Sequence, residues 1–209
     1  TPGAVGWTRT ARPGAPDKYF LVSADCHAVE PSGYLDGIEP EYKARIPRME
    51  LREDGSEWLI SEGNRPQRVK ASRKAAPALA GAEGTESQGL PAPVTGARMD
   101  DEDVLRNSTG RSVAERLAAH DADGIDAELM FPNKGLLCWA SPDPVFAMAM
   151  CRRWNRWAHG FCGEHMQGDS PRILHAALLA AGDQAGTLRE IRWAAEHGFR
   201  AVCLGTSVI

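Results

Sequence analysis

Apolar positions along the chain fall into short runs that alternate with longer amphipathic segments. Four of the runs are short and rich in aliphatic or aromatic residues, which is typical of strands. They cover 19–24 (YFLVSA), 127–132 (AELMFP), 172–180 (RILHAALLA) and 199–205 (FRAVCLG). We therefore predict four strands, three of them close together in the second half of the chain.

The segments between the later runs carry apolar residues three or four positions apart, as amphipathic helices do. They cover 112–124 (SVAERLAAHDADG), 143–162 (DPVFAMAMCRRWNRWAHGFC) and 183–198 (DQAGTLREIRWAAEHG). In the first of them Val113, Leu117 and Ala118 fall on one face, and Gly124 suits a helix end.

Strands that alternate with helices predict a parallel α/β fold, because each crossover needs a helix to return to the same edge of the sheet. The order indicates about four β/α units. Neither a G-x-G-x-x-G turn nor a G-x-x-x-x-G-K loop follows the first strand, so the phosphate-binding versions of this fold are not expected.

A long insertion separates the first strand from the first regular helix. We assign residues 1–18 to an N-terminal tail and residues 32–110 to the insertion, and we expect the insertion to cover a site as a lid. Asp54-Gly55 lies between two strand-like runs, which predicts a hairpin near 49–60. Ala, Gly and Pro dominate near 71–98 without a clear period, which predicts a flexible loop.

Composition narrows the classes of function. The chain is 43% hydrophobic and 25% charged, and its formal net charge is −4, which is ordinary for a globular protein and argues against a nucleic-acid partner. No apolar run approaches the roughly 18 residues of a membrane span. The five cysteines form no C-x-x-C pair, so we expect a reducing, cytoplasmic compartment rather than a disulfide scaffold.

The densest candidate chemistry is the stretch SADCHAVEP, residues 23–31. Residues two apart in a strand share a face, so Asp25 and His27 should point one way and Cys26 the other. Glu30 comes one turn of loop later. Carboxylate and imidazole ligands suit Zn²⁺, Fe²⁺ or Mn²⁺. From the spacing alone, a metal site competes with a strand-end cap beside a surface imidazole.

This stretch belongs to a set of blocks that resembles a known family. Downstream come HDADGIDAELMFPN, the 143–162 segment with its W-N-R-W centre, and EHGFRAVCLG. In this order the blocks are similar to the metal-dependent amidohydrolase superfamily, and they most resemble its amidohydrolase-2 branch, related to aminocarboxymuconate semialdehyde decarboxylase. Some members of the branch are thioesterases. The resemblance covers about 19–31 and 111–206.

The resemblance implies a distorted TIM (β/α)8 barrel with metal at the carboxyl ends of its strands. Asp25 and His27 correspond to the paired first-strand ligands, although the family often has H-x-H there. Glu30 corresponds to an additional acid, as a third ligand or a ligand of a second ion. One or two divalent ions (Zn, Fe or Mn) would lower the pKa of water, or orient a carboxylate for C–C cleavage.

Only four of the eight strands of such a barrel are expected in these 209 residues. The chain would then be the N-terminal half of a barrel, with a long insertion after strand 1. A half-barrel exposes unpaired strand edges, which is costly. We therefore expect a second polypeptide or chain segment to complete the barrel and the metal site, and we expect a homo-oligomer.

Three further residues are candidates for substrate binding. Asn133 follows the second strand and should lie near the site, unless it only forms the turn. Trp139 either walls the substrate pocket or packs internally. His175 lies within a strand, facing the barrel interior or the layer between strand and helix.

These residues support a metal-dependent hydrolase that uses metal-activated water on an amide, ester or thioester of a small molecule. The alternative with the same ligands is a non-oxidative decarboxylase. The non-enzyme alternative is an inactive barrel half that serves as an assembly subunit. The substrate itself is left open, because pocket-lining loops carry it.

Overall fold

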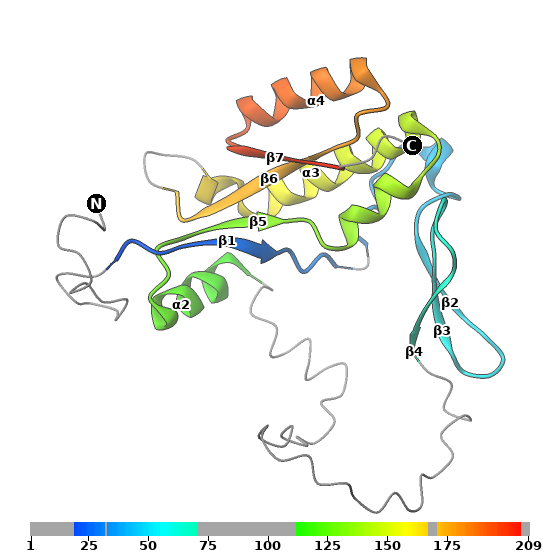
Figure 1. Cartoon of the computed structure of the whole chain (residues 1–209), viewed down its shortest axis with the longest axis horizontal. Coiled ribbons are helices and arrows are strands. Elements are labelled where there is room, and N and C mark those ends of the chain that lie inside the picture. The colour runs from blue at the N-terminus through cyan, green and yellow to red at the C-terminus, as the bar shows by residue number, and fades with distance from the viewer. Residues whose placement is uncertain (1–18, 32, 71–111, 167–170, 206–209) are drawn as a thin grey trace, which may run out of the picture.

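Four parallel strands form the central sheet of this computed structural model, which describes residues 19–31, 33–70, 112–166 and 171–205. Their order is β1-β5-β6-β7 (Figure 1), and each strand pairs in parallel with the next. Their bounds are Val22–His27, Ala127–Phe131, Ile173–Leu179 and Ala201–Leu204. The sheet curls as half of a barrel does, so the predicted α/β class and the four parallel strands are confirmed at this level.

Three helices connect the strands. They are α2 (Val113–Asp123), α3 (Pro144–Met166) and α4 (Gln184–Glu196). Ser112 caps α2 by accepting a hydrogen bond from the Glu115 N–H, and Gly124 ends it with a φ of 75°, where glycine is favoured. Asp183 caps α4 through the Gly186 N–H. The helix ends therefore lie where the capping residues of the sequence indicate.

The first strand begins three residues later than predicted, at Val22 instead of residue 19. Leu21 has its own partners before the ladder starts, because its N–H donates to the Asp126 carboxylate and its carbonyl accepts from the Asp126 N–H. The pairing of β1 with β5 also shifts register between Ser23 and Cys26, so the strand carries a bulge that simple alternation does not anticipate.

One face of the sheet contacts the helices. Glu128 pairs with Ile173, and Met130 pairs with His175, and paired residues of neighbouring strands point to the same side. Glu128 hydrogen-bonds residues of α2, and the His175 ring contacts Trp154 of α3. The helices therefore cover this face, and the opposite face corresponds to the inside of a barrel.

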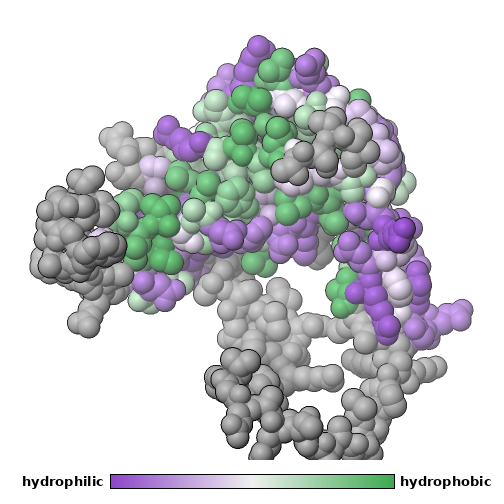
Figure 2. Space-filling model, viewed as in Figure 1, coloured by the Kyte–Doolittle hydropathy of each residue, from purple (hydrophilic) through white to green (hydrophobic). Residues whose placement is uncertain are grey.

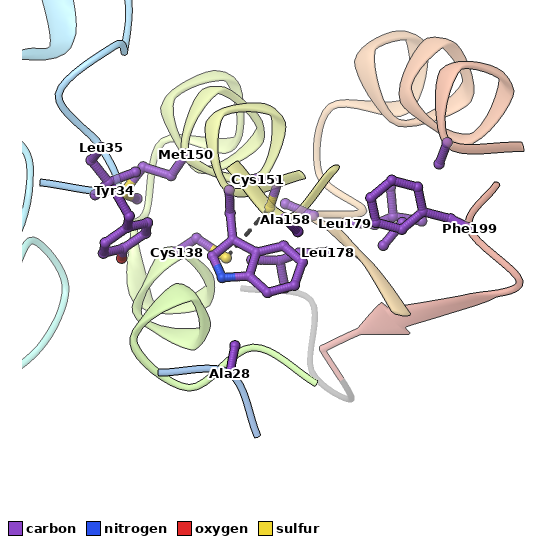
Figure 3. Close-up of a cluster of buried hydrophobic side chains, with 14 of the residues drawn as sticks. Ala28, Tyr34, Leu35, Cys138, Met150, Cys151, Ala158, Leu178, Leu179 and Phe199 are labelled. Atoms are coloured by element: carbon purple, nitrogen blue, oxygen red, sulfur yellow. Dashed lines mark hydrogen bonds between the residues drawn. The ribbon is translucent and has the colours of Figure 1, made fainter. Parts of the chain in front are cut away.

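The hydrophobic core lies between this sheet and α3. Met148, Cys151, Trp154 and Ala158 are completely buried along one side of α3, as their spacing predicts. Figure 3 shows the core from close by, with the Cys138 and Cys151 thiols facing each other and their sulfur atoms 3.4 Å apart.

The buried face of α2 differs from the prediction. Val113, Arg116 and His120 are buried, whereas Ala118 is exposed and Leu117 is only half-buried. The reason is the buried carboxylate of Glu128 on β5, which accepts hydrogen bonds from both basic side chains. An ion pair thus decides the rotation of this helix, where hydrophobicity alone favours a different face.

A second, antiparallel sheet of three strands stands beside the half-barrel (Figure 1). It consists of β2 (Arg48–Leu51), β3 (Glu57–Ile60) and β4 (Gln67–Lys70). The turn between β2 and β3 contains Gly55 at a φ of 78°, as the Asp-Gly signal predicts, whereas β4 was not predicted. The tail at 1–18 and the loop near 71–98 lie outside the described residues.

Apolar side chains remain uncovered at the last strand and the last helix, and Figure 2 shows green, hydrophobic residues gathered over the upper part of the molecule. The exposed apolar side chains include Val202 and Leu204 of β7 and Leu188 and Ile191 of α4, all of them more than a third exposed. A further β/α unit beside β7 would bury such residues.

Candidate functional site

Asp25 and His27 lie together at the carboxyl end of β1. The Asp25 Oδ1 atom is 3.4 Å from the His27 Nε2 atom. His27 pairs with Phe131 of β5 and so points to the face opposite the helices. The side chains are 91% and 47% exposed, which leaves both groups open to a ligand from solvent.

A backbone carbonyl fixes the imidazole of His27. Its Nδ1 atom lies 2.9 Å from the Pro132 carbonyl oxygen, and because a carbonyl can only accept, Nδ1 carries the proton. In the neutral ring Nε2 is then unprotonated and faces Asp25. Metal-binding histidines usually have this arrangement, in which one ring nitrogen donates to a carbonyl and the other is free to ligate.

Glu30 lies in the protein interior, unlike the exposed side chains of Asp25 and His27. It is 1% exposed. Its carboxylate accepts hydrogen bonds from the backbone N–H groups of Asn133, Lys134 and Gly135. The indole N–H of Trp154 donates to it as well, at 2.8 Å. The carboxylate is therefore enclosed by donors on the protein interior, whereas Asp25 faces solvent.

Of the three predicted ligands, the structure brings Asp25 and His27 side by side at the exposed strand end and buries Glu30. Within the described ranges, no group of three or more His, Cys, Asp or Glu side chains is arranged to hold an ion. Asp25 and His27 fit a divalent ion by their atom types and exposure, and the remaining ligands would come from outside these elements.

Cys26 points away from this pair, as the alternation predicts. Its sulfur is 2.9 Å from the Ser23 hydroxyl oxygen, and it pairs with Met130 on the helix-facing side of the sheet. Burial, and to a lesser degree the nearby Glu128 carboxylate, raises the pKa of the Cys26 thiol above its ordinary value. A protonated thiol on the helix side does not suit nucleophilic catalysis.

Behind the strand end lies a buried ionic network that sequence reasoning did not identify. Arg116 donates through Nε to Glu128, and its Nη2 donates to the His27 carbonyl at 3.3 Å. His120 Nε2 lies 3.0 Å from the second oxygen of Glu128. The network ties α2 to β5 and to the backbone of His27. The sequence signal for this network is a basic residue, Arg116, on the side of α2 that is buried.

Asn133 immediately precedes a short 3-10 helix, η3 (Lys134–Ala140), that follows β5, and Trp139 lies within this helix. The Asn133 side chain is exposed, and its backbone N–H binds Glu30. Trp139 is half-buried, and its indole N–H donates to the Leu179 carbonyl at the end of β6, 2.8 Å away. Both residues therefore lie at the carboxyl ends of the strands, where the predicted substrate contacts would be.

His175 lies in the core between sheet and helix. Its ring contacts Trp154 edge-on at 5.5 Å and Phe199 at 6.2 Å, between ring centroids. Among the residues that the structure describes, none hydrogen-bonds to either ring nitrogen. Burial, followed by the charge of Arg116, lowers the pKa of His175 to about 3, and the Met130 backbone opposes the shift. The structure thus separates His175 from the face that carries His27.

Comparison with solved structures provides a relative in fold. A crystal structure of an amidohydrolase from Mycobacterium avium subsp. paratuberculosis K-10 matches with a TM-score of 0.61 at 17% sequence identity. The match covers 89% of this chain and 49% of the other. The two proteins share a fold. At this identity the likeness extends to the fold alone, and this chain spans about half the length of that amidohydrolase.

No protein-family model matches the chain, and no curated protein sequence matches it. Among the described residues, none of the helices has the length and apolar character needed to cross a membrane.

Proposed function

We propose that this chain supplies the first-strand ligands and part of the substrate-facing rim of a metal-dependent hydrolase that acts on an amide, ester or thioester. The observation that carries the proposal is the pair formed by Asp25 and His27, exposed at the carboxyl end of β1. In parallel α/β folds this end of the sheet is where catalytic groups gather.

The electronic state of the pair supports ligation. The Pro132 carbonyl holds the proton of His27 on Nδ1, so that Nε2 presents its lone pair beside the Asp25 carboxylate. When bound, a divalent ion (Zn, Fe or Mn) would act as a Lewis acid and make water a better nucleophile near neutral pH. The chain's own contribution is to place a neutral imidazole and a carboxylate on one exposed strand end.

The rim beside the pair supports a substrate role. Asn133 is exposed directly after β5, and Trp139 covers the end of β6. An amide and a partly exposed indole can bind a polar group and an apolar part of the same small molecule. We therefore assign substrate contacts to Asn133 and Trp139, and we assign a core position to His175.

The remaining ligands are proposed to come from a polypeptide segment that continues the sheet. Within the described part of the chain, β1 and β7 each pair with only one strand, and β7 exposes Val202 and Leu204. The structural relative extends over about twice the matched length. A segment of further β/α units beside these two strands would close the barrel and surround the Asp25–His27 pair.

Isothermal titration of the protein with Zn²⁺ and Mn²⁺ tests the ligand assignment. His27→Ala should lose binding, whereas the control His165→Ala, which changes an exposed histidine at the end of α3, should retain it. Equal binding by the wild type and His27→Ala would contradict the proposal.

The reaction class is tested by turnover of the native assembly on a panel of amides, esters, thioesters and aromatic carboxylic acids. Hydrolysis that depends on added metal and on His27 is the expected result. Release of CO₂ from the acids would favour the decarboxylase instead. A wild-type assembly that binds no metal and turns over none of these compounds would leave the non-enzyme subunit as the remaining reading.

A further inference from the structure

We infer that Glu30 is a positioning residue and not a metal ligand: its buried carboxylate holds the start of η3 and thereby places Asn133 and Trp139 at the rim. The role of the rim in substrate binding rests on the proposed function. The anchoring of η3 by Glu30 does not.

The donors around the Glu30 carboxylate leave it little capacity for an ion. Oε1 accepts from the N–H groups of Asn133 at 2.9 Å and Gly135 at 3.2 Å, and from the Trp154 indole at 2.8 Å. Oε2 accepts from the Lys134 N–H at 3.1 Å. All four partners are donors, which matches an ionised carboxylate acting only as an acceptor. To bind a metal, Glu30 would have to abandon these buried N–H groups without replacement.

The same contacts explain why η3 begins at Lys134. The first N–H groups of a helix have no partner within the helix, and here one side chain from the β1 loop satisfies three consecutive N–H groups. A further contact links the same two loops, because the Lys134 ammonium donates to the Glu30 carbonyl at 2.7 Å. The loop after β1 and the loop after β5 are thus fixed to each other.

The far end of η3 is fixed separately. The Trp139 indole donates to the Leu179 carbonyl, and a Cβ at Gly205 would come 3.2 Å from the Trp139 ring. With Glu30 at one end and β6 at the other, η3 spans the ends of β1, β5 and β6. Loss of the Glu30 anchor should free the Asn133 end while Trp139 stays bound to β6.

The close packing around the Glu30 carboxylate supports its assignment as a positioning residue. A Cβ added at Gly135 would lie 2.6 Å from the Trp154 ring, so the backbone approaches the indole closely. Glycine permits its N–H to reach Glu30 while Trp154 donates to the same oxygen. The Gly135 N–H, the Trp154 indole and the Glu30 carboxylate therefore form one closely packed hydrogen-bond network, which is typical of a structural role.

Amide hydrogen exchange, followed by NMR, tests the inference in the wild-type protein first. The amides of Asn133, Lys134 and Gly135 should be protected without metal, and saturating Zn²⁺ should leave their exchange rates unchanged. Rapid exchange of these amides in the metal-free protein, or Zn²⁺-induced loss of their protection, would overturn the inference. If Zn²⁺ does not bind at all, the proposed function fails, while protection of the three amides still decides the anchoring role.

Glu30→Gln provides the second measurement, with Glu53→Gln as the same change at an exposed position of the hairpin turn. Glu30→Gln should accelerate exchange of the three amides by roughly tenfold or more and keep the Zn²⁺ stoichiometry of the wild type. Glu53→Gln should change neither. Loss of Zn²⁺ binding with unchanged amide protection in Glu30→Gln would identify Glu30 as a ligand and contradict the inference.

Discussion

Two acidic side chains of one nine-residue stretch have opposite surroundings. Asp25 is 91% exposed, and its Oδ1 atom lies 3.4 Å from the Nε2 atom of His27. Glu30 is 1% exposed and accepts four hydrogen bonds from the protein interior. The strand end therefore exposes a carboxylate and an imidazole to solvent, and the buried side chains immediately behind it hold that end in place.

The difference shows that the hydrogen-bond donors around an acidic side chain, and not its spacing in the sequence, decide whether it can bind a metal ion. A metal ligand needs lone pairs that an ion can reach, and the exposed Asp25 carboxylate offers them. A carboxylate that accepts hydrogen bonds from buried N–H groups uses its lone pairs to stabilise the fold. Glu128, buried behind the same strand between Arg116 and His120, belongs with Glu30 in this second class.

The largest expected effect comes from breaking the buried pair behind the strand end. Arg116→Met removes the cation that binds Glu128 and the His27 carbonyl, and it leaves a buried carboxylate that still contacts His120. We expect the free energy of unfolding to fall by about 3–5 kcal/mol in urea denaturation. The control Arg152→Met breaks the more exposed pair with Glu39 and should cost less than about 1 kcal/mol. Similar losses for both variants would show that burial does not distinguish the two layers.

Glu30→Gln should give the next largest effect. The amide oxygen can keep some of the four donors, but the new NH₂ group faces at least one backbone N–H and leaves it without an acceptor. We expect the unfolding free energy to fall by about 2–3 kcal/mol, measured by thermal and urea unfolding. A loss as small as that of Glu53→Gln would place Glu30 with the exposed acids and remove the contrast with Asp25.

Acid should destabilise the protein through His175. Its folded-state pKa of about 3 lies below the unfolded value of 6.5, so the unfolded state takes up the proton first. This contribution to stability is fully present above pH 6.5 and is lost as the pH falls toward 3. Between pH 8 and pH 5 the unfolding free energy should fall by about 2 kcal/mol from this group.

His175→Leu keeps an apolar side chain between Trp154 and Phe199 and removes the titrating group. Its unfolding free energy should depend less on pH over the same range, as measured by urea denaturation at several pH values. An unchanged pH dependence would mean that His175 does not titrate between the two states.

The smallest effect on stability is expected at the exposed strand end. Asp25→Asn removes a carboxylate that faces solvent, so the unfolding free energy should change by less than about 0.5 kcal/mol, while affinity for Zn²⁺ falls. A large loss of stability would show that Asp25 serves the fold, as Glu30 does.

The sequence predicts the parallel strands and the three helices well because their signals are local. Apolar runs, capping residues such as Ser112 and the stop at Gly124 act within a few positions of the element they define. The bulge in β1 depends instead on pairing with a strand far along the chain. The rotation of α2 depends on Glu128, which lies outside the helix on β5 and selects which face of α2 is buried. Single-sequence patterns do not contain that pairing.

The candidate site likewise contains residues that the local sequence pattern places and residues that only tertiary contacts place. The strand period places Asp25 and His27 on one side and Cys26 on the other, and the structure has this arrangement. Glu30 follows the strand, where no period applies, and its partners lie more than 100 positions away. Its location therefore depends on the tertiary fold. For His175 the sequence left two faces open, and pairing with Met130 selects the helix side.

We propose that His27 presents Nε2 as a ligand while Nδ1 stays protonated on the Pro132 carbonyl. Nitrogen-15 NMR of the imidazole during a Zn²⁺ titration tests it most directly. We expect that Zn²⁺ shifts the Nε2 resonance of His27, that Nδ1 keeps its proton, and that Asp25→Asn weakens the shift. A titration that leaves both His27 nitrogens unchanged, or that shifts Nδ1 instead, would contradict it.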